Sequence, residues 1–319
     1  MARNKVKISG VICTLNEASN IGDCIDSLAG VDEVIVADDG STDDTVQIAR
    51  EHGAKVIRRH DHRERATNDI IRMFKEKFGW EPSFTNQTLI RNGHLEAKEG
   101  EDAASHDWVV RPDADERVTW NLPYIREIIL PQADQVVCDF VHSHRPDGSP
   151  DRVSRITKMW RRSKTQIVGR THTCIIPNGV INYTRRMRVD HWQPVGHTQS
   201  YVLPILEYCV VRDDDNRSRF YLGRQYYLDH RYSEAITLLE LYLSRADWIP
   251  EIAHARLYLA RAFWESGKGD QAREQCREAV TLNPDFGEAL YLMSELYFEP
   301  WSSKWRAIAE RATNDGVLF

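Results

Sequence analysis

Strand-length apolar runs alternate with amphipathic stretches over the first 60 residues. The runs at 5–15, 33–37 and 54–57 predict buried strands, while apolar residues recur at helical spacing in 18–28 and 41–53. Ser41-Thr42-Asp43-Asp44 has the form of a capping box, which predicts that the second helix begins there. Strand–helix–strand–helix–strand order with short connections predicts a parallel sheet with helices on both faces, as in nucleotide-binding α/β domains.

The pattern is less regular after residue 60. Residues 60–85 are rich in His, Arg and Lys and are expected to form a long excursion above the sheet, either a lid or an acceptor loop. A helix capped by Asn86 is predicted to run to Gly100, followed by a buried strand at 108–110. Residues 136–192 predict further strands, with a hairpin turn at Asn178-Gly179.

Strand signals stop near residue 212, and an internal repeat begins. The small residues Gly223, Ala260 and Ser294 are spaced 37 and 34 residues apart, and an aromatic residue follows each by three positions. This period is typical of tetratricopeptide repeats, in which small residues allow two helices to cross closely. The third copy departs from the pattern, since Arg306 stands at the crossing position and Ala307 fits only with an insertion. We therefore predict an α/β domain over 1–211 and an all-α, tetratricopeptide-like domain over 212–319.

Composition places few further limits on the chain. Its 319 residues carry a formal net charge of −6, which argues against a surface devoted to nucleic acid. No apolar run is long enough to cross a bilayer, and the N-terminus lacks a secretory pattern. The six scattered cysteines indicate free thiols in a reducing compartment. The expected localisation is cytoplasmic.

Three polar clusters fall where predicted strands end. They are Thr14-Leu15-Asn16-Glu17, then Asp38-Asp39-Gly40-Ser41-Thr42-Asp43, and finally Asp113-Ala114-Asp115-Glu116. Ligands bind at the carboxyl ends of strands in open α/β sheets, and paired carboxylates suit Mg²⁺ or Mn²⁺ with a phosphate as a further ligand. Taken singly, the second cluster also fits a turn and helix cap, and the third a solvated acidic loop. Glycine-rich dinucleotide and P-loop motifs are absent from the sequence.

In these clusters the chain resembles family-2 glycosyltransferases of GT-A fold. Residues 8–57 look like the nucleotide-binding half of these enzymes, and Asp113-Ala114-Asp115 looks like their Asp-x-Asp motif. Arg91-Asn92 is similar to an Arg-Asn pair found upstream of that motif. The segment 169–172 and the later His191 resemble a Gly-x-x-His segment and a distal His. A helical-repeat tail recurs in one branch, which includes peptide S-glycosyltransferases.

The resemblance implies a role for each of these residues. Thr14 and Asp39 would contact the nucleotide base and Glu17 the nucleoside, with Asn16 and Gly40 in the same nucleotide-sugar site. Asp113 would lie at the ribose and metal, while Asp115 and His191 would bind the metal that bridges the diphosphate. Arg91 would bind phosphate, because a guanidinium matches phosphate oxygens. Two departures are Arg111-Pro112 in place of an apolar strand end, and Thr173 where a Glu often follows the His.

The catalytic base is left open by the sequence. An inverting transfer needs a base near the acceptor nucleophile, and the candidates are Asp139, His142, His144, Asp151 and His172. At most one of His142 and His144 is expected to act at a given site, because a structural role is common for a lone His. We predict His172 first and Asp139 second.

A basic cluster at 58–65 allows two interpretations. Its own acidic residues fit a solvated, self-compensating loop, and the alternative is a phosphate-rich or nucleic-acid acceptor, which is not favoured.

The sequence thus predicts a glycosyltransferase that uses Mn²⁺ or Mg²⁺ and a nucleotide-sugar donor, expected to be a UDP-sugar, with inversion. The expected acceptor is a protein or peptide, and the repeats could support a homo-oligomer. The alternatives are a glycan or lipid-linked sugar acceptor, a modified nucleic-acid base, and a binding module without catalysis.

Overall fold

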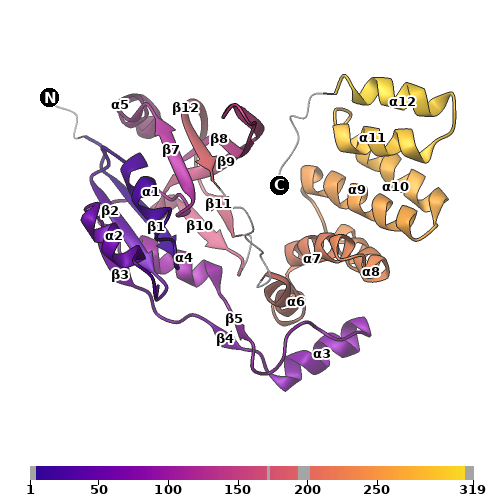
Figure 1. The fold of residues 1–319 in the computed structure, drawn as a ribbon, viewed down its shortest axis with the longest axis horizontal. Coiled ribbons are helices and arrows are strands. Elements are labelled where there is room, and N and C mark those ends of the chain that lie inside the picture. Colours follow the sequence, from indigo (N-terminus) through magenta and orange to yellow (C-terminus); the bar gives the residue numbers. More distant parts are fainter. Residues whose placement is uncertain (1–4, 171–172, 193–201, 313–319) are drawn as a thin grey trace. The chain divides into compact units, whose positions relative to one another are not determined.

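The computed structural model describes residues 5–170, 173–192 and 202–312, which form two compact units. The first unit comprises residues 1–64 and 91–198, and the second comprises 65–90 and 199–319 (Figure 1). The sequence predicted a division at 211/212. The structure instead groups the segment 65–90 and the helix α6 (Val202–Arg212) with the C-terminal helices.

The first unit is built on a mixed, eight-stranded sheet with the order β3-β2-β1-β6-β9-β8-β12-β7. Strands β1, β2, β3 and β6 are parallel to one another, and β9 pairs antiparallel with β6 and β8. The predicted α/β architecture and the parallel first half of the sheet are therefore confirmed. The strands of this sheet are β1 (Ile8–Thr14), β2 (Glu33–Asp38), β3 (Lys55–Arg58), β6 (Trp108–Val110), β7 (Glu116–Trp120), β8 (Gln135–His144), β9 (Pro150–Arg161) and β12 (Ile181–His191).

Alternation along β1 and β2 gives the sheet two buried faces. Ile8, Ile12 and Val36 pack against α1 (Ile21–Ser27) and α2 (Thr45–Glu51), together with the helical segment that follows β7. Val11 and Ile35 pack on the opposite face, with α4 (Gly93–Asp102) and β10 (Thr165–Val168). Strands covered on both faces read as continuous apolar runs, which explains why the sequence located them.

Short elements complete this unit. They are α5 (Leu122–Tyr124), the π-helix η1 (Ile125–Ile129), the 3-10 helices η2 (Leu130–Gln132) and η3 (Arg162–Lys164), and β11 (Cys174–Pro177). The hairpin predicted at Asn178-Gly179 is wrong, because β11 pairs with β10 while β12 pairs with β7 and β8. The turn instead joins two sheets. A glycine suits it because the Asp134 carboxylate would lie 2.3 Å from a Cβ at position 179.

The excursion at 60–85 is not an irregular loop throughout. It contains the helix α3 (Asn68–Phe78), with the two-residue strands β4 (Glu64–Arg65) and β5 (Leu89–Ile90) near the two ends of the segment. Phe74 and Phe78 are buried in one core with Leu206 and Val210 of α6. The predicted helix start at Asn86 is also wrong, since α4 begins after Asn92, whose side chain accepts from the Leu95 amide.

Helix pairs make up the rest of the second unit. They are α7 (Asn216–Leu228) with α8 (Tyr232–Leu243), α9 (Ile249–Glu265) with α10 (Gly269–Leu282), and α11 (Gly287–Leu296) with α12 (Trp301–Ala309). A Cβ at Gly223 would lie 2.8 Å from Leu239 Cγ, so a glycine permits the close crossing of α7 and α8. In α12 the exposed Arg306 and Ala307 do not fill the crossing position, and Ala309 is the buried small residue.

Candidate active site

The three polar clusters lie at one edge of the sheet. β1 lies between β2 and β6 and is parallel to both, with Thr14 opposite Asp38 and Gly10 opposite Val110. The chain continues from Val110 to Asp113 in the direction of the β1 end, and the Cys24 thiol donates to the Asp113 carbonyl at 3.3 Å. Parallel strands place their carboxyl ends together, so the sheet itself gathers the predicted site residues.

The loops after β1 and β2 are joined by side chains. Asn16 has φ of +55°, and its Oδ1 accepts from the Thr42 amide at 2.8 Å, while its own amide donates to Ser41 Oγ at 2.9 Å. Glu17 accepts a 2.8 Å hydrogen bond from Asn20 through its carboxylate. Asn16 thus holds the two loops together at the edge of the predicted nucleotide site.

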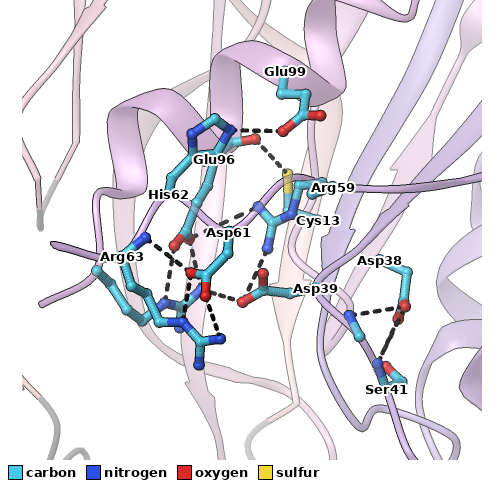
Figure 2. A network of polar contacts seen from close by, with 12 residues as sticks. Cys13, Asp38, Asp39, Ser41, Arg59, Asp61, His62, Arg63, Glu96 and Glu99 are labelled. Carbon is cyan, nitrogen blue, oxygen red and sulfur yellow. Dashed lines mark hydrogen bonds and ion pairs between the residues drawn. The ribbon is translucent and has the colours of Figure 1, made fainter. Parts of the chain in front are cut away.

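Gly40 shapes the turn that follows β2. Its φ is +88°, and its amide donates to Asp38 Oδ2 at 2.9 Å (Figure 2). The Ser41 amide donates to the same buried carboxylate at 3.1 Å. Asp38 therefore closes the turn, which leaves the next residue, Asp39, to face the polar network of this edge.

Asp39 lies within a half-buried cluster of charges (Figure 2). Its Oδ2 is 3.6 Å from an Arg59 nitrogen and 3.7 Å from an Arg91 nitrogen, and both arginines also face Glu96, at 3.8 and 2.7 Å. Burial raises the pKa of Asp39, while the charge of Arg59 opposes that shift. Arg91 therefore lies beside Asp39, in the part of the site where the nucleotide base is predicted to bind.

Two buried polar atoms near this cluster lack hydrogen-bond partners among the described residues. They are Thr14 Oγ1, at the end of β1, and Arg59 Nε. Burying an unsatisfied polar atom is costly, so each of them indicates a place where a polar ligand can bind.

The basic cluster at 58–65 is paired with acids, as one of its two interpretations requires. Arg63 donates to Asp61 at 2.7 Å, and this contact lowers the pKa of the Asp61 carboxyl to about 2. His62 lies 2.7 Å from Glu99, and Arg59 faces Asp39 (Figure 2). These contacts favour the self-compensating loop over a phosphate-binding patch.

Asp115 and His191 come together at the far end of the same edge. His191 Nε2 lies 3.0 Å from Asp115 Oδ2, and the Trp192 amide donates to the Asp115 carbonyl at 2.8 Å. The antiparallel pairing of β7 with β12 causes this approach, because it sets His191 opposite Glu116. The hydrogen bond to Asp115 raises the pKa of His191.

Lys158 is a functional candidate that the sequence analysis missed. Its ammonium lies 2.6 Å from Glu116 and 3.4 Å from Asp113 Oδ2, and its side chain is only 12% exposed. Burial alone would lower the pKa of Lys158, but the Asp113 and Glu116 carboxylates raise it, so the residue is positively charged. A signal was present, since Lys158 stands beside the apolar Met159 and Trp160 in a predicted strand region.

The candidate bases are distributed over different places. His172 lies outside the described residues. Asp139 accepts a 2.6 Å hydrogen bond from the Tyr183 hydroxyl. The next residue, Phe140, has its ring 6.0 Å from that of His191, so strand alternation directs Asp139 to the opposite face of the sheet. The structure does not bring Asp139 to the Asp115–His191 pair.

His142 lies on the same face as that pair. Its ring is 4.7 Å from Phe140, and its Nε2 is 2.7 Å from Ser154 Oγ. Burial lowers the pKa of His142 to about 4, which keeps the imidazole neutral at pH 7. His144 instead pairs with Asp190 at 3.0 Å, and Asp151 faces Arg145.

Two of the three predicted metal ligands are placed so that they could bind one divalent cation. Asp115 offers a carboxylate oxygen and His191 an imidazole nitrogen, donor types that bind Mn²⁺, and a diphosphate would supply the remaining oxygens. Asp113, the third predicted ligand, faces Lys158. Within the ranges that the structure describes, no three His, Cys, Asp or Glu side chains are arranged to hold a metal.

Comparisons with known proteins support the family resemblance. Residues 9–80 match the model described as glycosyl transferase family 2, which supports the resemblance found in the sequence for this part of the chain. A glycosyltransferase of Rickettsia felis is 60% identical over 52 residues, which are 16% of this chain and 18% of that protein. The chain thus spans about a fifth of that relative's length.

Other relatives match over longer stretches. The lipopolysaccharide core biosynthesis glycosyltransferase LpsC of Rhizobium meliloti is 24% identical over 279 residues, 82% of this chain and 84% of that protein. Among solved structures, glucosyl-3-phosphoglycerate synthase of Mycobacterium tuberculosis with Mn²⁺ and UDP is 24% identical, with 44% and 45% of the two chains covered and a TM-score of 0.28. Mannosyl-3-phosphoglycerate synthase of Rubrobacter xylanophilus is 20% identical, with 46% and 44% covered and a TM-score of 0.29.

The described residues contain no helix of the length and hydrophobicity needed to span a membrane.

Proposed function

We propose that this chain transfers a sugar from a nucleotide-sugar donor, a UDP-sugar, to an acceptor nucleophile with inversion and with the help of a divalent cation. The single observation that carries the proposal is the edge of the sheet where β2, β1 and β6 end. Thr14 ends β1, Asp39 follows β2, and the turn that contains Asp115 follows β6, and these three neighbouring strands are parallel. The family match over residues 9–80 covers the first two of these positions.

The nucleotide would lie over the ends of β1 and β2. Asp39 would accept a hydrogen bond from the base, and Thr14 Oγ1, which is buried without a partner among the described residues, would satisfy its hydrogen-bonding capacity there. Arg91 lies beside Asp39 and would bind on the nucleoside side rather than at the diphosphate end first expected for it. Glu17 and Asn16 would shape the loop that borders the nucleoside.

The diphosphate would extend toward Asp115 and His191, which would hold Mn²⁺ or Mg²⁺. When bound, the cation supplies positive charge to the leaving diphosphate as the sugar–phosphate bond breaks. His172 remains the proposed base. Asp139 stays an alternative only if its face of the sheet receives the acceptor. His142, whose pKa is lowered by burial, lies on the same face as Asp115 and His191.

The acceptor is a separate part of the proposal. The sequence favoured a protein or peptide because of its helical tail. The Rhizobium meliloti relative, which matches over most of both chains, is named for lipopolysaccharide core biosynthesis, and this favours a saccharide acceptor. We propose a glycan, with a peptide as the alternative. The second unit, whose helix pairs we interpret as tetratricopeptide-like, would bind the acceptor or a second copy of the chain.

Calorimetry with UDP and Mn²⁺ tests the core of the proposal. We expect UDP binding that depends on Mn²⁺ and slow hydrolysis of one UDP-sugar in a panel of nucleotide sugars. Asp115→Asn should weaken the Mn²⁺-dependent binding and slow the hydrolysis, whereas Asp102→Asn, at an exposed carboxylate paired with Lys98, should leave both intact. UDP binding without any turnover of any donor sugar would favour the binding module instead.

A further inference from the structure

A buried lysine lies beneath the turn that carries the proposed metal ligand. Lys158, on β9, places its ammonium 2.6 and 2.7 Å from the two oxygens of Glu116 and 3.4 Å from Asp113 Oδ2. The Phe140 ring covers the ammonium at 5.4 Å. An ammonium that is so nearly enclosed by protein requires compensating carboxylates, and these two provide them.

The turn itself is closed by reciprocal hydrogen bonds. The Glu116 amide donates to the Asp113 carbonyl at 3.0 Å, and the Asp113 amide donates to Glu116 Oε2 at 3.0 Å. Asp113 and Glu116 are therefore tied both to each other and to Lys158. The third carboxylate of the turn, Asp115, makes its contact with His191 instead.

We propose that Lys158 is a positioning residue that neutralises Asp113 and Glu116, so that a divalent cation is offered only Asp115 and His191. The inference rests on the proposed function, because it concerns the metal that this function requires. A fixed positive charge beside the turn that carries Asp115 lowers the affinity of the protein alone for a cation. The phosphate oxygens of the donor must then complete the ligand set.

This arrangement makes the affinity for the metal depend on whether a diphosphate is bound. A metal that meets one carboxylate and one imidazole binds weakly by itself and more tightly when a diphosphate is present. Linkage requires that the metal strengthen diphosphate binding by the same factor. Lys158 would thus make metal binding depend on the nucleotide, so that the cation is held firmly only when a diphosphate is bound.

The test is a titration of the protein with Mn²⁺ alone. Binding is measured as the loss of the electron paramagnetic resonance signal of free Mn²⁺. Lys158→Met removes the charge and keeps the length of the side chain. We expect it to bind Mn²⁺ more tightly, by roughly tenfold. The factor by which UDP strengthens Mn²⁺ binding should decrease. Weaker or unchanged Mn²⁺ binding in a folded Lys158→Met protein would overturn the proposal.

A second variant predicts a change of opposite sign. Glu116→Gln removes one of the two carboxyl groups that Lys158 faces and leaves Asp113 as its partner, so the positive charge beside the site is less compensated and Mn²⁺ binding should weaken. Its fold is less at risk, because the lysine keeps a carboxylate partner. If Lys158→Met does not fold, this variant decides, and tighter or unchanged binding in it overturns the proposal. Lys158→Arg keeps the charge and should retain an affinity close to the native one.

These outcomes separate the inference from the function on which it rests. If the unsubstituted protein binds no Mn²⁺ with or without UDP, the proposed metal-dependent function fails. If it binds Mn²⁺ with UDP but the substitutions at 158 and 116 cause no shift, only the role of Lys158 fails.

Discussion

Asp115 and His191 are separated by 76 positions in the chain, yet Asp115 Oδ2 and His191 Nε2 lie 3.0 Å apart. The antiparallel pairing of β7 with β12 produces this approach, since Glu116 and His191 are opposite each other in register. The pair joins the end of the last strand of the unit to the turn after β6. It is the feature from which the proposed metal site is built.

Loss of either member of this pair should weaken metal binding. We expect Asp115→Asn and His191→Asn each to lower the affinity for Mn²⁺ in the presence of UDP by roughly 10- to 100-fold, as loss of a metal-site partner commonly does. The double variant should lose less than the sum of the two, because both residues act on one ion. Calorimetry measures all three. Additive losses would mean that the two side chains do not share a ligand.

Nucleotide recognition should be separable from metal binding. Asp39→Asn replaces a carboxylate by an amide at the proposed base contact. It should weaken UDP binding by roughly tenfold, because a hydrogen bond to a charged group contributes about 1.5–3 kcal/mol. Binding of Mn²⁺ alone should not change, because Asp39 follows β2 whereas Asp115 follows β6. A parallel loss of Mn²⁺ affinity would contradict the proposed division of the site.

The stability of the first unit should depend on pH through His142. Its pKa is lowered to about 4 by burial, whereas an unfolded histidine titrates near 6.5. Between these values the unfolded state binds more protons. The contribution of His142 is therefore fully present above about pH 6.5 and decreases as the pH falls toward 4. Urea unfolding followed by tryptophan fluorescence at pH 7.5, 6 and 5 measures this decline.

His142→Gln should make that decline shallower, because the glutamine does not titrate. Ser154→Ala, which removes the hydroxyl 2.7 Å from His142, should lower stability at every pH and keep the slope. An unchanged slope in His142→Gln would assign the pH dependence to other groups.

The segment 65–90 should depend on Glu207 for its attachment to the helices of the second unit. The buried Glu207 carboxylate accepts from the Ser83 amide at 2.6 Å and from the Tyr226 hydroxyl at 2.7 Å. Glu207→Gln sets an amide group against these donors and should cost about 1–3 kcal/mol of unfolding free energy. Hydrogen exchange at residues 80–84 should accelerate. Glu240→Gln, on the exposed face of α8, is the matched control and should change neither.

Local pattern was sufficient for the first strands and for the helix pairs. β1 and β2 are covered on both faces, so their sequences are nearly continuous apolar runs, and α9 and α10 repeat small residues where they cross. The segment 60–90 shows where such reasoning ended. Its charged composition suggested an exposed loop, but Phe74 and Phe78 lie on one side of α3 and are buried against Leu206 and Val210. Nothing near residue 75 in sequence indicates that this surface is supplied by residue 206.

The residues of the candidate site also fall into those that local sequence could suggest and those that it could not. Thr14, Asp39 and Asp115 could be proposed as site residues from sequence, because they lie at or just after the ends of strands whose parallel order brings those ends together. Lys158 could not be assigned, because its partners Asp113 and Glu116 lie more than 40 positions earlier in the chain. Asp139 was a reasonable candidate by residue type. Only the pairing of β8 with β12 decided that it faces away from His191.

The amino-acid sequence alone determined the two kinds of domain, the family resemblance and the acidic turn at 113–116, since these depend on local periodicity and on motifs of a few residues. The tertiary structure decided which side chains meet: Asp115 with His191, Lys158 with Glu116, and Glu207 with Ser83. The physical reason is that strand register and helix packing fix contacts between distant positions. Each such contact is stabilised by burial of the whole unit and not by the residues adjacent to it in the chain.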